Sequence, residues 1–223
     1  MINYIFTTLD DGNLAYHVND DKKNIAQNRQ NLKHKYNIPI ENLKFMNQTH
    51  GCNIKVVTDN SQECMDDCDA IITNTLNLPL MVMVADCIPI LMYDDKRNVI
   101  AAIHAGRNGT FLNIASKTAI FMREHFNCNV ENIKVVLGPS IQKCCYEVSS
   151  ELEEIAKKSF GKEFTNNRLI DLQGINTKQL LDIGFKSENI ETSTICTKCS
   201  GEKYFSYRID SRCGRFAGII SLN

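Results

Sequence analysis

The feature that most constrains the fold is an apolar stretch from residue 76 to residue 92. It is interrupted by four residues: Asn77, Pro79, Asp86 and Pro89. It therefore lacks the run of about 20 predominantly apolar residues that a membrane helix needs. Residues 80–85 are apolar at consecutive positions, which indicates a strand covered on both faces, and apolar sequence resumes at Ile90. Asp86 and Cys87 are accordingly predicted to be a buried pair.

The remaining pattern predicts strands and helices that do not alternate strictly. Further strands are predicted at residues 55–57, 69–73, 99–103, 133–137, 169–172, 190–195, 204–208 and 216–222. Helices are predicted at residues 21–34 with Asp20 as the cap, at 111–126 after a turn at 106–109, at 149–160 and at 176–183. This order favours an α+β fold, a mixed sheet with helices outside, over a doubly wound parallel sheet.

Size and charge limit the class of protein. A chain of 223 residues suffices for one domain over residues 1–223, since a domain of this size buries roughly 70% of the surface that its unfolded chain exposes. With 25 Lys and Arg against 26 Asp and Glu, no long-range field draws the chain to nucleic acid or to anionic lipid. We therefore expect small molecules or other proteins as partners, with no nucleic acid and no membrane.

The N-terminus and the cysteines indicate a reducing compartment. The first residues lack the basic residues and the longer apolar run of a signal peptide, so we expect a cytoplasmic protein. Its ten cysteines are then predicted to be thiols or metal ligands rather than disulfides. Cys196 and Cys199 have the spacing of a zinc or thiol-redox pair, and Cys64 with Cys68 is a candidate source of two further ligands.

His50, Cys87 and His104 are the strongest candidates for chemistry. Each follows or interrupts apolar sequence at a short polar or glycine-containing step. Two imidazoles and one thiolate make a set that holds zinc with a fourth position open for water or substrate. Each of these residues alone is more often an ordinary core or strand-end residue, and their spacing is too long for a local metal motif. Asp86 beside Cys87 favours a site, because burying an unpartnered carboxylate costs several kcal/mol.

Five blocks of sequence carry a resemblance to a known family. They are Asn47-Gln48-Thr49-His50-Gly51, Ala85-Asp86-Cys87-Ile88-Pro89-Ile90-Leu91, Ala102-Ile103-His104-Ala105-Gly106, Gly138-Pro139-Ser140-Ile141 with Tyr146-Glu147-Val148, and Phe205-Ser206-Tyr207-Arg208 with Gly214-Arg215. In order and separation they resemble the YfiH, or laccase-domain, family over nearly the whole chain. Members of this family have been described as laccase-like polyphenol oxidases and as purine nucleoside phosphorylases.

The resemblance implies both a fold and an activity. It implies a single domain in which mixed sheets are packed between helical layers, in the order α/β/β/α. It implies zinc, with copper as an alternative ion in vitro, held by His50, Cys87 and His104 beside a nucleoside pocket. The implied reaction converts adenosine or inosine and phosphate to base and ribose 1-phosphate, with adenosine deaminase and methylthioadenosine phosphorylase as added activities. The oligomeric state is expected to be a monomer or a homodimer.

Further residues are predicted to act beside His50, Cys87 and His104. Arg107 follows His104 in a glycine turn that opens a helix, where backbone N–H groups and a guanidinium suit phosphate, although a solvated surface charge fits equally well. Asp86 is either a general acid or base, or a partner that orients His50 or His104. Gln48, Asn108 and Arg215 are predicted to bind substrate. A structural alternative for Arg208 and Arg215 is pairing with buried carboxylates, and this is expected of Arg208 more than of Arg215.

The chain departs from the family pattern in three places, and other functions stay open. Leu9 stands where members usually carry arginine, Arg107-Asn108 replaces Trp-Arg, and Ile209 replaces a second arginine. Anion binding and substrate preference are the properties that these departures affect. A multicopper oxidase would need more imidazoles than the chain's five histidines supply. The alternatives are an amidase that edits peptidoglycan precursors and a non-catalytic metal-binding protein.

Overall fold

Two mixed β-sheets form the centre of the molecule, and the computed structural model describes residues 1–201 and 203–223. The first sheet has the order β1 (Ile2–Phe6), β13 (Phe216–Leu222), β6 (Leu80–Val84), β2 (Lys44–Met46) and β4 (Cys64–Met65). The second has the order β12 (Ile190–Thr192), β9 (Lys134–Leu137), β7 (Ile88–Asp94), β8 (Val99–Ala105), β5 (Ala70–Thr73) and β3 (Ile54–Val56). A short hairpin joins β10 (Thr165–Asn166) and β11 (Leu169–Ile170).

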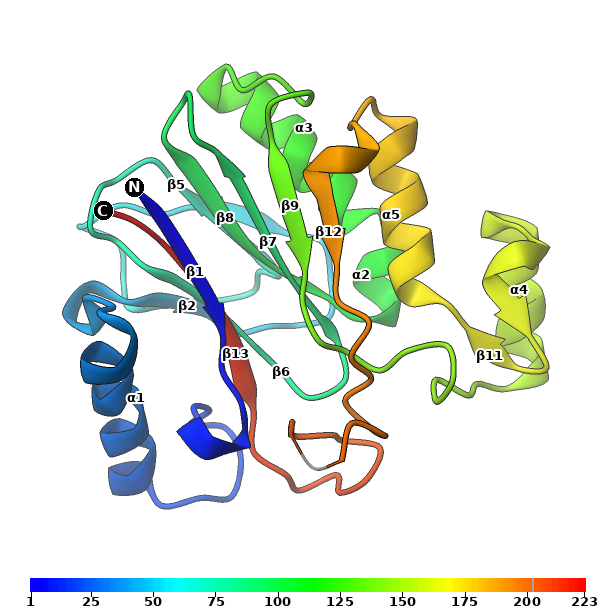
Figure 1. The fold of residues 1–223 in the computed structure, drawn as a ribbon, viewed down its shortest axis with the longest axis horizontal. Helices are drawn as coiled ribbons and strands as arrows, with labels where there is room; N and C mark the ends of the chain where they lie inside the picture. Colours follow the sequence, from blue (N-terminus) through cyan, green and yellow to red (C-terminus); the bar gives the residue numbers. More distant parts are fainter. Residues whose placement is uncertain (202) are drawn as a thin grey trace.

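Helices cover the outer faces of the two sheets. The described residues form five α-helices: α1 (Lys22–Tyr36), α2 (Arg107–Phe111), α3 (Ile114–Phe126), α4 (Ser150–Phe160) and α5 (Leu172–Asp182). Four 3₁₀ turns accompany them: η1 (Leu9–Asp11), η2 (Ile40–Asn42), η3 (Lys162–Phe164) and η4 (Ser187–Asn189). Helix α1 lies on one side of the strands and α3 and α5 lie on the other (Figure 1). No helix in the described part of the chain is long and apolar enough to cross a membrane.

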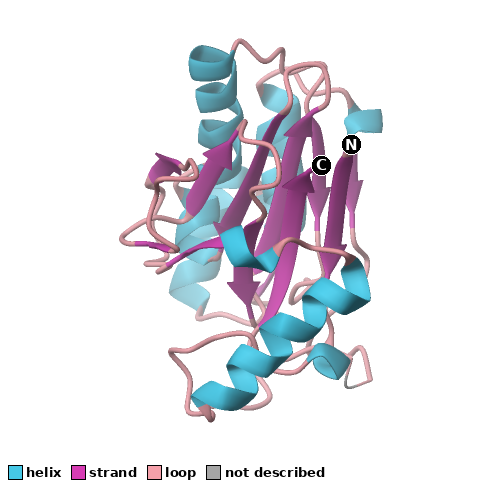
Figure 2. Ribbon diagram, turned by 90° about the vertical axis from the view of Figure 1, so that its left-hand side faces the viewer, coloured by secondary structure: helices cyan, strands magenta, loops and turns pink. Residues whose placement is uncertain are grey.

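The alternation of side chains along β6 shows why the layers form. Leu80, Val82 and Val84 pack into a core between the two sheets, while Met81 and Met83 pack into a second core under α1. All five side chains are buried, as expected for a strand with apolar residues at consecutive positions. A third core lies between the second sheet and the helices α3, α4 and α5. The helix–sheet–sheet–helix order, visible edge-on in Figure 2, confirms the predicted α/β/β/α fold.

The connections between the strands bring the candidate residues to one end of the sheets. Residues 85–87 carry the chain from β6 in the first sheet to β7 in the second. His104 lies near the end of β8, which pairs with β7 so that His104 faces Pro89 in the register. His50 follows β2 in a loop and has a φ of 60°, while Asp86 has a φ of 86°. Such left-handed conformations are uncommon for residues with a side chain, and they occur often at functional sites.

Several element boundaries differ from the predictions. Asp21 caps α1 by accepting a hydrogen bond from Lys23 N–H at 2.9 Å, so the prediction of Asp20 as the cap is wrong. Residues 107–109, predicted as part of a turn, belong to α2, and a left-handed Asn113 separates α2 from α3. The strand predicted at 204–208 is also wrong. That segment is irregular and ends in a turn, and Arg208 N–H donates to Asp86 at 2.8 Å rather than to a neighbouring strand.

Candidate active site and metal centre

The three predicted metal ligands come together at one end of the two sheets. One donor atom from each of His50, Cys87 and His104 lies within 4.8 Å of the other two. The Sγ of Cys87 is 4.0 Å from Nε2 of His50. Tetrahedral zinc, with Zn–S of about 2.3 Å and Zn–N of about 2.0 Å, brings sulfur and nitrogen to about 3.5 Å from each other. The Cys87–His50 separation is thus slightly longer than in a zinc site, and the chemistry of the three donors fits zinc.

A buried carboxylate that the sequence reasoning missed holds two of these ligands in place. Asp69 is fully buried just before β5, and its Oδ1 accepts hydrogen bonds from Nδ1 of His104 at 2.7 Å and from the backbone N–H of His50 at 3.0 Å. Its Oδ2 accepts from Gly51 N–H at 2.7 Å. A carboxylate on Nδ1 fixes the tautomer of His104 and leaves Nε2 for a metal. The available sequence signal was a carboxylate at the start of an apolar strand.

The charges of the cluster depend on one another. Burial alone would raise the pKa of the Cys87 thiol, but His104 and His50 lower that pKa to about 6. Burial alone would lower the pKa of His104, but the Cys87 thiolate and Asp69 raise it to about 9. Burial alone would raise the pKa of Asp69, but His104 and the N–H of Gly51 lower it to about 2. Cys87 is therefore prepared as a thiolate, and a metal that binds here displaces a proton from His104.

Gly106, two residues after the last ligand, leaves the cluster accessible. A Cβ added at Gly106 would lie 3.0 Å from Sγ of Cys87 and 3.1 Å from Cδ2 of His50. A side chain at this position would have to displace one of the two ligands. Gly106 therefore keeps the space on the ligand side of β8 open.

A cavity of about 610 Å³ opens beside the cluster. Its wall contains all eight residues that the sequence singled out: His50, Cys87, His104, Asp86, Arg107, Gln48, Asn108 and Arg215. The structure thus brings the eight together, while their individual roles stay predictions. The wall also contains four residues to which sequence reasoning gave no place in the site: His17, Tyr146, Tyr207 and Arg208.

Both carboxylate oxygens of Asp86 accept hydrogen bonds from other parts of the protein. Its Oδ1 accepts a hydrogen bond from Oγ1 of Thr197 at 2.6 Å, and its Oδ2 accepts from Arg208 N–H at 2.8 Å. The expectation that Asp86 orients His50 or His104 is therefore wrong, since Asp69 has that position. Asp86 instead ties two distant segments of the chain to the strand connection that carries Cys87.

Gln48, Arg107 and Asn108 also have partners within the protein. Gln48 exchanges two hydrogen bonds with the backbone of Met83, at 2.8 and 2.9 Å, and so holds the loop of His50 against β6. Arg107 donates from Nε and Nη2 to Oδ1 of Asn108, at 3.1 and 2.9 Å, and both residues are exposed. Arg107 and Asn108 therefore present one joined polar surface at the cavity.

The cavity has an excess of positive charge. Arg208 donates both Nη groups to the carbonyl oxygen of Glu147 at 3.0 Å, and Arg215 donates Nη1 to the carbonyl oxygen of Cys213 at 2.6 Å. Within residues 1–201 and 203–223, no ion pair with an Asp or Glu side chain involves either of these arginines or Arg107. The expected pairing of Arg208 with a buried carboxylate is therefore wrong, and the guanidinium charges remain available to an anion.

Two tyrosines complete the wall. The guanidinium of Arg208 lies over the ring of Tyr146 at 5.0 Å, and that of Arg215 lies over the ring of Tyr207 at 6.0 Å. Tyr207 is 52% exposed, so its side chain is accessible to a ligand. Flat aromatic surfaces beside cations suit a ligand that combines a planar ring with an anion.

Comparisons with known proteins show which proteins this chain resembles. A family model described as multi-copper polyphenol oxidoreductase laccase matches residues 5–223. A purine nucleoside phosphorylase of Clostridium acetobutylicum is 35% identical over 96% of this chain and 89% of the relative. An adenosine deaminase from an unknown prokaryotic organism is 29% identical over 93% of this chain and 86% of the relative. The solved structure of the hypothetical protein YfiH from Bacillus licheniformis, 26% identical, matches with a TM-score of 0.89 over 100% of this chain and 93% of that one.

Proposed function

Since this chain belongs to the YfiH, or laccase-domain, family, we propose that it is a zinc-dependent purine nucleoside phosphorylase. Its relatives named purine nucleoside phosphorylase and adenosine deaminase make it an enzyme of that type. The observation that carries the proposal is the cluster of His50, Cys87 and His104 in the wall of a cavity whose guanidinium groups have no carboxylate partners among the described residues.

The proposed reaction is phosphorolysis of the N-glycosidic bond. A phosphate oxygen forms a bond to C1′ of the ribose while the bond from C1′ to the purine nitrogen breaks, and the purine leaves with the bonding electron pair and takes up a proton. Arg107, Arg208 and Arg215 are the groups that can hold the phosphate, because guanidinium groups pair with phosphate oxygens through two parallel hydrogen bonds. Tyr146 and Tyr207 offer ring faces to the purine.

The proposed role of a metal in the reaction is argued from the three side chains that would bind it. Zinc bound by His50, Cys87 and His104 would lower the pKa of a bound water to about 7, which supplies the nucleophile that deamination of adenosine requires. Asp69 orients His104, and Asp86 anchors the segment that carries Arg208. This assignment makes adenosine deaminase activity a second function of the same cavity, and the adenosine deaminase relative favours it.

Zinc is proposed in preference to copper although the family description names copper. The sequence has five histidines, and among the described residues only His50 and His104 belong to a metal-binding cluster. A multicopper centre needs several ions held mainly by imidazoles, so one thiolate and two imidazoles do not suffice. Copper binding to the same three donors in vitro is compatible with this argument, since copper has a high affinity for such ligands.

The test is an assay of inosine, adenosine and methylthioadenosine with and without phosphate, on protein whose zinc content has been measured. Phosphate-dependent formation of ribose 1-phosphate, or of methylthioribose 1-phosphate, is the expected result. Ammonia released from adenosine without phosphate would identify the deaminase. Turnover of none of the three substrates by zinc-loaded protein would contradict the proposal.

Assays on the same zinc-loaded protein distinguish the remaining alternative functions. A peptidoglycan-precursor editing amidase would release an amino acid from a wrongly built precursor, whereas a non-catalytic metal-binding protein would turn over neither substrate class. The departures at Leu9, Arg107-Asn108 and Ile209 make substrate preference the property to measure first. Action in the cytoplasm, as a single-domain monomer or as a homodimer, stays a prediction.

A further inference from the structure

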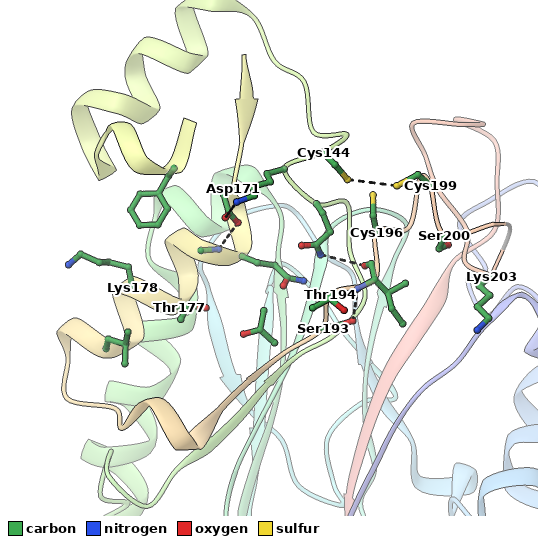
Figure 3. A pocket seen from close by; sticks show the side chains of 18 residues that line it. Cys144, Asp171, Thr177, Lys178, Ser193, Thr194, Cys196, Cys199, Ser200 and Lys203 are labelled. Carbon is green, nitrogen blue, oxygen red and sulfur yellow. Dashed lines mark hydrogen bonds and ion pairs between the residues drawn. The ribbon is translucent and has the colours of Figure 1, made fainter. Parts of the chain in front are cut away.

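A second group of metal-binding side chains lies outside the cavity described above. Cys144 and Cys145 lie between β9 and α4, and Cys196 and Cys199 follow β12. One sulfur atom from each of the four lies within 4.8 Å of the others. Figure 3 shows Cys144 on one segment of the chain facing Cys196 and Cys199 on another. The sequence-based prediction that Cys64 and Cys68 complete the pair of Cys196 and Cys199 is therefore wrong.

The distances between the sulfur atoms suit one shared ion. Sγ of Cys144 lies 3.7 Å from Sγ of Cys145 and 3.7 Å from Sγ of Cys199. A tetrahedral zinc with four Zn–S distances of about 2.3 Å places its sulfur atoms about 3.8 Å apart. A disulfide would instead bring two sulfur atoms to about 2.05 Å. The four cysteines are thus spaced as ligands of a metal and not as two covalent pairs.

The backbone around Cys196 prepares a thiolate. Burial alone would raise the pKa of Cys196, but backbone N–H groups of Gln142, Cys199 and Lys198 lower it to about 7. Burial and hydrogen bonds with the sulfurs of Cys196, Cys145 and Cys199 raise the pKa of Cys144. Four sulfurs gathered so closely cannot all be ionised without a cation among them.

We propose that Cys144, Cys145, Cys196 and Cys199 bind a structural zinc ion, separate from the ion at His50, Cys87 and His104. Four thiolates fill a tetrahedral coordination sphere, so this zinc has no open position for water or substrate. Soft thiolate ligands in a tetrahedral set select zinc or iron over magnesium, calcium and manganese. A single ion here joins two loops that lie far apart in the chain.

The two loops that this zinc would join carry residues of the active-site cavity. Thr197, between two of the cysteines, donates to Asp86, and Tyr146 follows Cys145 directly in the cavity wall. Backbone hydrogen bonds between the loops run from Thr197 N–H to the carbonyl oxygen of Ser140 at 3.0 Å and from Ser140 N–H to that of Ile195 at 3.4 Å. The zinc would therefore fix the position of Tyr146, and only this consequence rests on the proposed function.

The experiment counts zinc per chain in reduced, desalted protein by mass spectrometry of the metal. Wild-type protein is expected to hold two zinc ions, the Cys144→Ser/Cys199→Ser variant one, and the His50→Ala/His104→Ala variant one. Cys64→Ser is the matched control and should hold two. Equal zinc in the wild type and the Cys144→Ser/Cys199→Ser variant would overturn the proposal, and so would iron in place of the second zinc.

A second measurement needs no variant and no activity. Cys199 is exposed, so a free thiol there would be accessible to an alkylating reagent. We expect all four cysteines to be protected in zinc-loaded protein and to become reactive together after chelation, while the reactivity of Cys64 stays unchanged. Rapid alkylation before chelation, or an intact mass that shows a disulfide among the four, would overturn the proposal. Failure of the nucleoside assay would leave both readouts unaffected.

Discussion

The cluster of His50, Cys87 and His104 takes its ligands from strand ends and their connections, whereas the four-cysteine cluster takes its ligands from two loops. In the first, Asp69 is fully buried and holds two ligands through hydrogen bonds. In the second, backbone N–H groups lower the pKa of Cys196. Three ligands held rigidly by the sheets can leave the fourth coordination position of a metal open for water or substrate. Loops, in contrast, become ordered when four of their side chains fill the whole coordination sphere.

The two clusters are nevertheless connected. Asp86, next to Cys87, accepts a hydrogen bond from Thr197, which lies between Cys196 and Cys199. This contact is buried, so a shift of the cysteine loop would reach the strand connection that carries Cys87. The comparison thus predicts large effects from the first cluster and smaller, indirect effects from the second.

Removing a ligand of the first cluster should have the largest effect. His104→Ala is expected to lose the zinc at this site and to lower kcat/KM by more than the ~100-fold that loss of an outer partner can cost. The measurement is ammonia release from adenosine, for which the zinc-bound water is the proposed nucleophile, together with zinc content. His34→Ala, an exposed histidine on α1, is the control and should keep both. If His104→Ala keeps activity near that of the wild type, the cluster of His50, Cys87 and His104 is not needed for catalysis.

Removing the partner of the ligand should have the next largest effect. Asp69→Asn keeps the shape of the side chain but removes the charge that orients His104, and we expect a loss of roughly 10- to 100-fold in zinc affinity or activity. Competition with a chelator measures the affinity. Asp66→Asn, an exposed carboxylate close in sequence, is the matched control. Equal zinc affinity in the Asp69 and Asp66 variants would contradict the role given to Asp69.

The arginines of the cavity should affect phosphate more than nucleoside. A hydrogen bond to a charged group contributes about 1.5–3 kcal/mol, so Arg208→Ala and Arg215→Ala are each expected to raise the KM for phosphate roughly tenfold or more. The nucleoside KM should change less. Arg212→Ala is the control, because Arg212 is exposed and pairs with Asp210 outside the cavity wall. If neither Arg208→Ala nor Arg215→Ala changes the KM for phosphate, phosphate does not bind at these two arginines.

A mixed sheet with helices outside could be predicted from local pattern, whereas the order of two sheets between helical layers came from the family resemblance. Residues 80–85 are apolar at consecutive positions, and this alone requires cover on both faces of the strand. The segment 204–208 shows the limit of such reasoning. It has the composition of a strand, yet Arg208 N–H bonds to Asp86 and not to a neighbouring strand. That contact joins residues 122 positions apart, which no local pattern contains.

The candidate active site could likewise be predicted only in part. The types of His50, Cys87 and His104 suggested a metal, and the fold brings them together. Asp69 was missed because its contact with His104 spans 35 positions and because it begins a strand that looked structural. Cys196 and Cys199 were recognised as a pair, but spacing could not show that Cys144 and Cys145, rather than Cys64 and Cys68, lie beside them.

The smallest effect is expected from the four-cysteine cluster. Cys199→Ser should lower kcat/KM by roughly 2- to 10-fold, or about 0.4–1.4 kcal/mol, because it loosens the loop of Thr197 without touching a ligand of the first cluster. The zinc at His50, Cys87 and His104 should remain, as metal analysis can verify. Cys64→Ser, with unchanged kcat/KM, is the control. A loss as large as that of His104→Ala would show that the two clusters act as one unit, and the contrast between an open catalytic set and a closed structural set would fail.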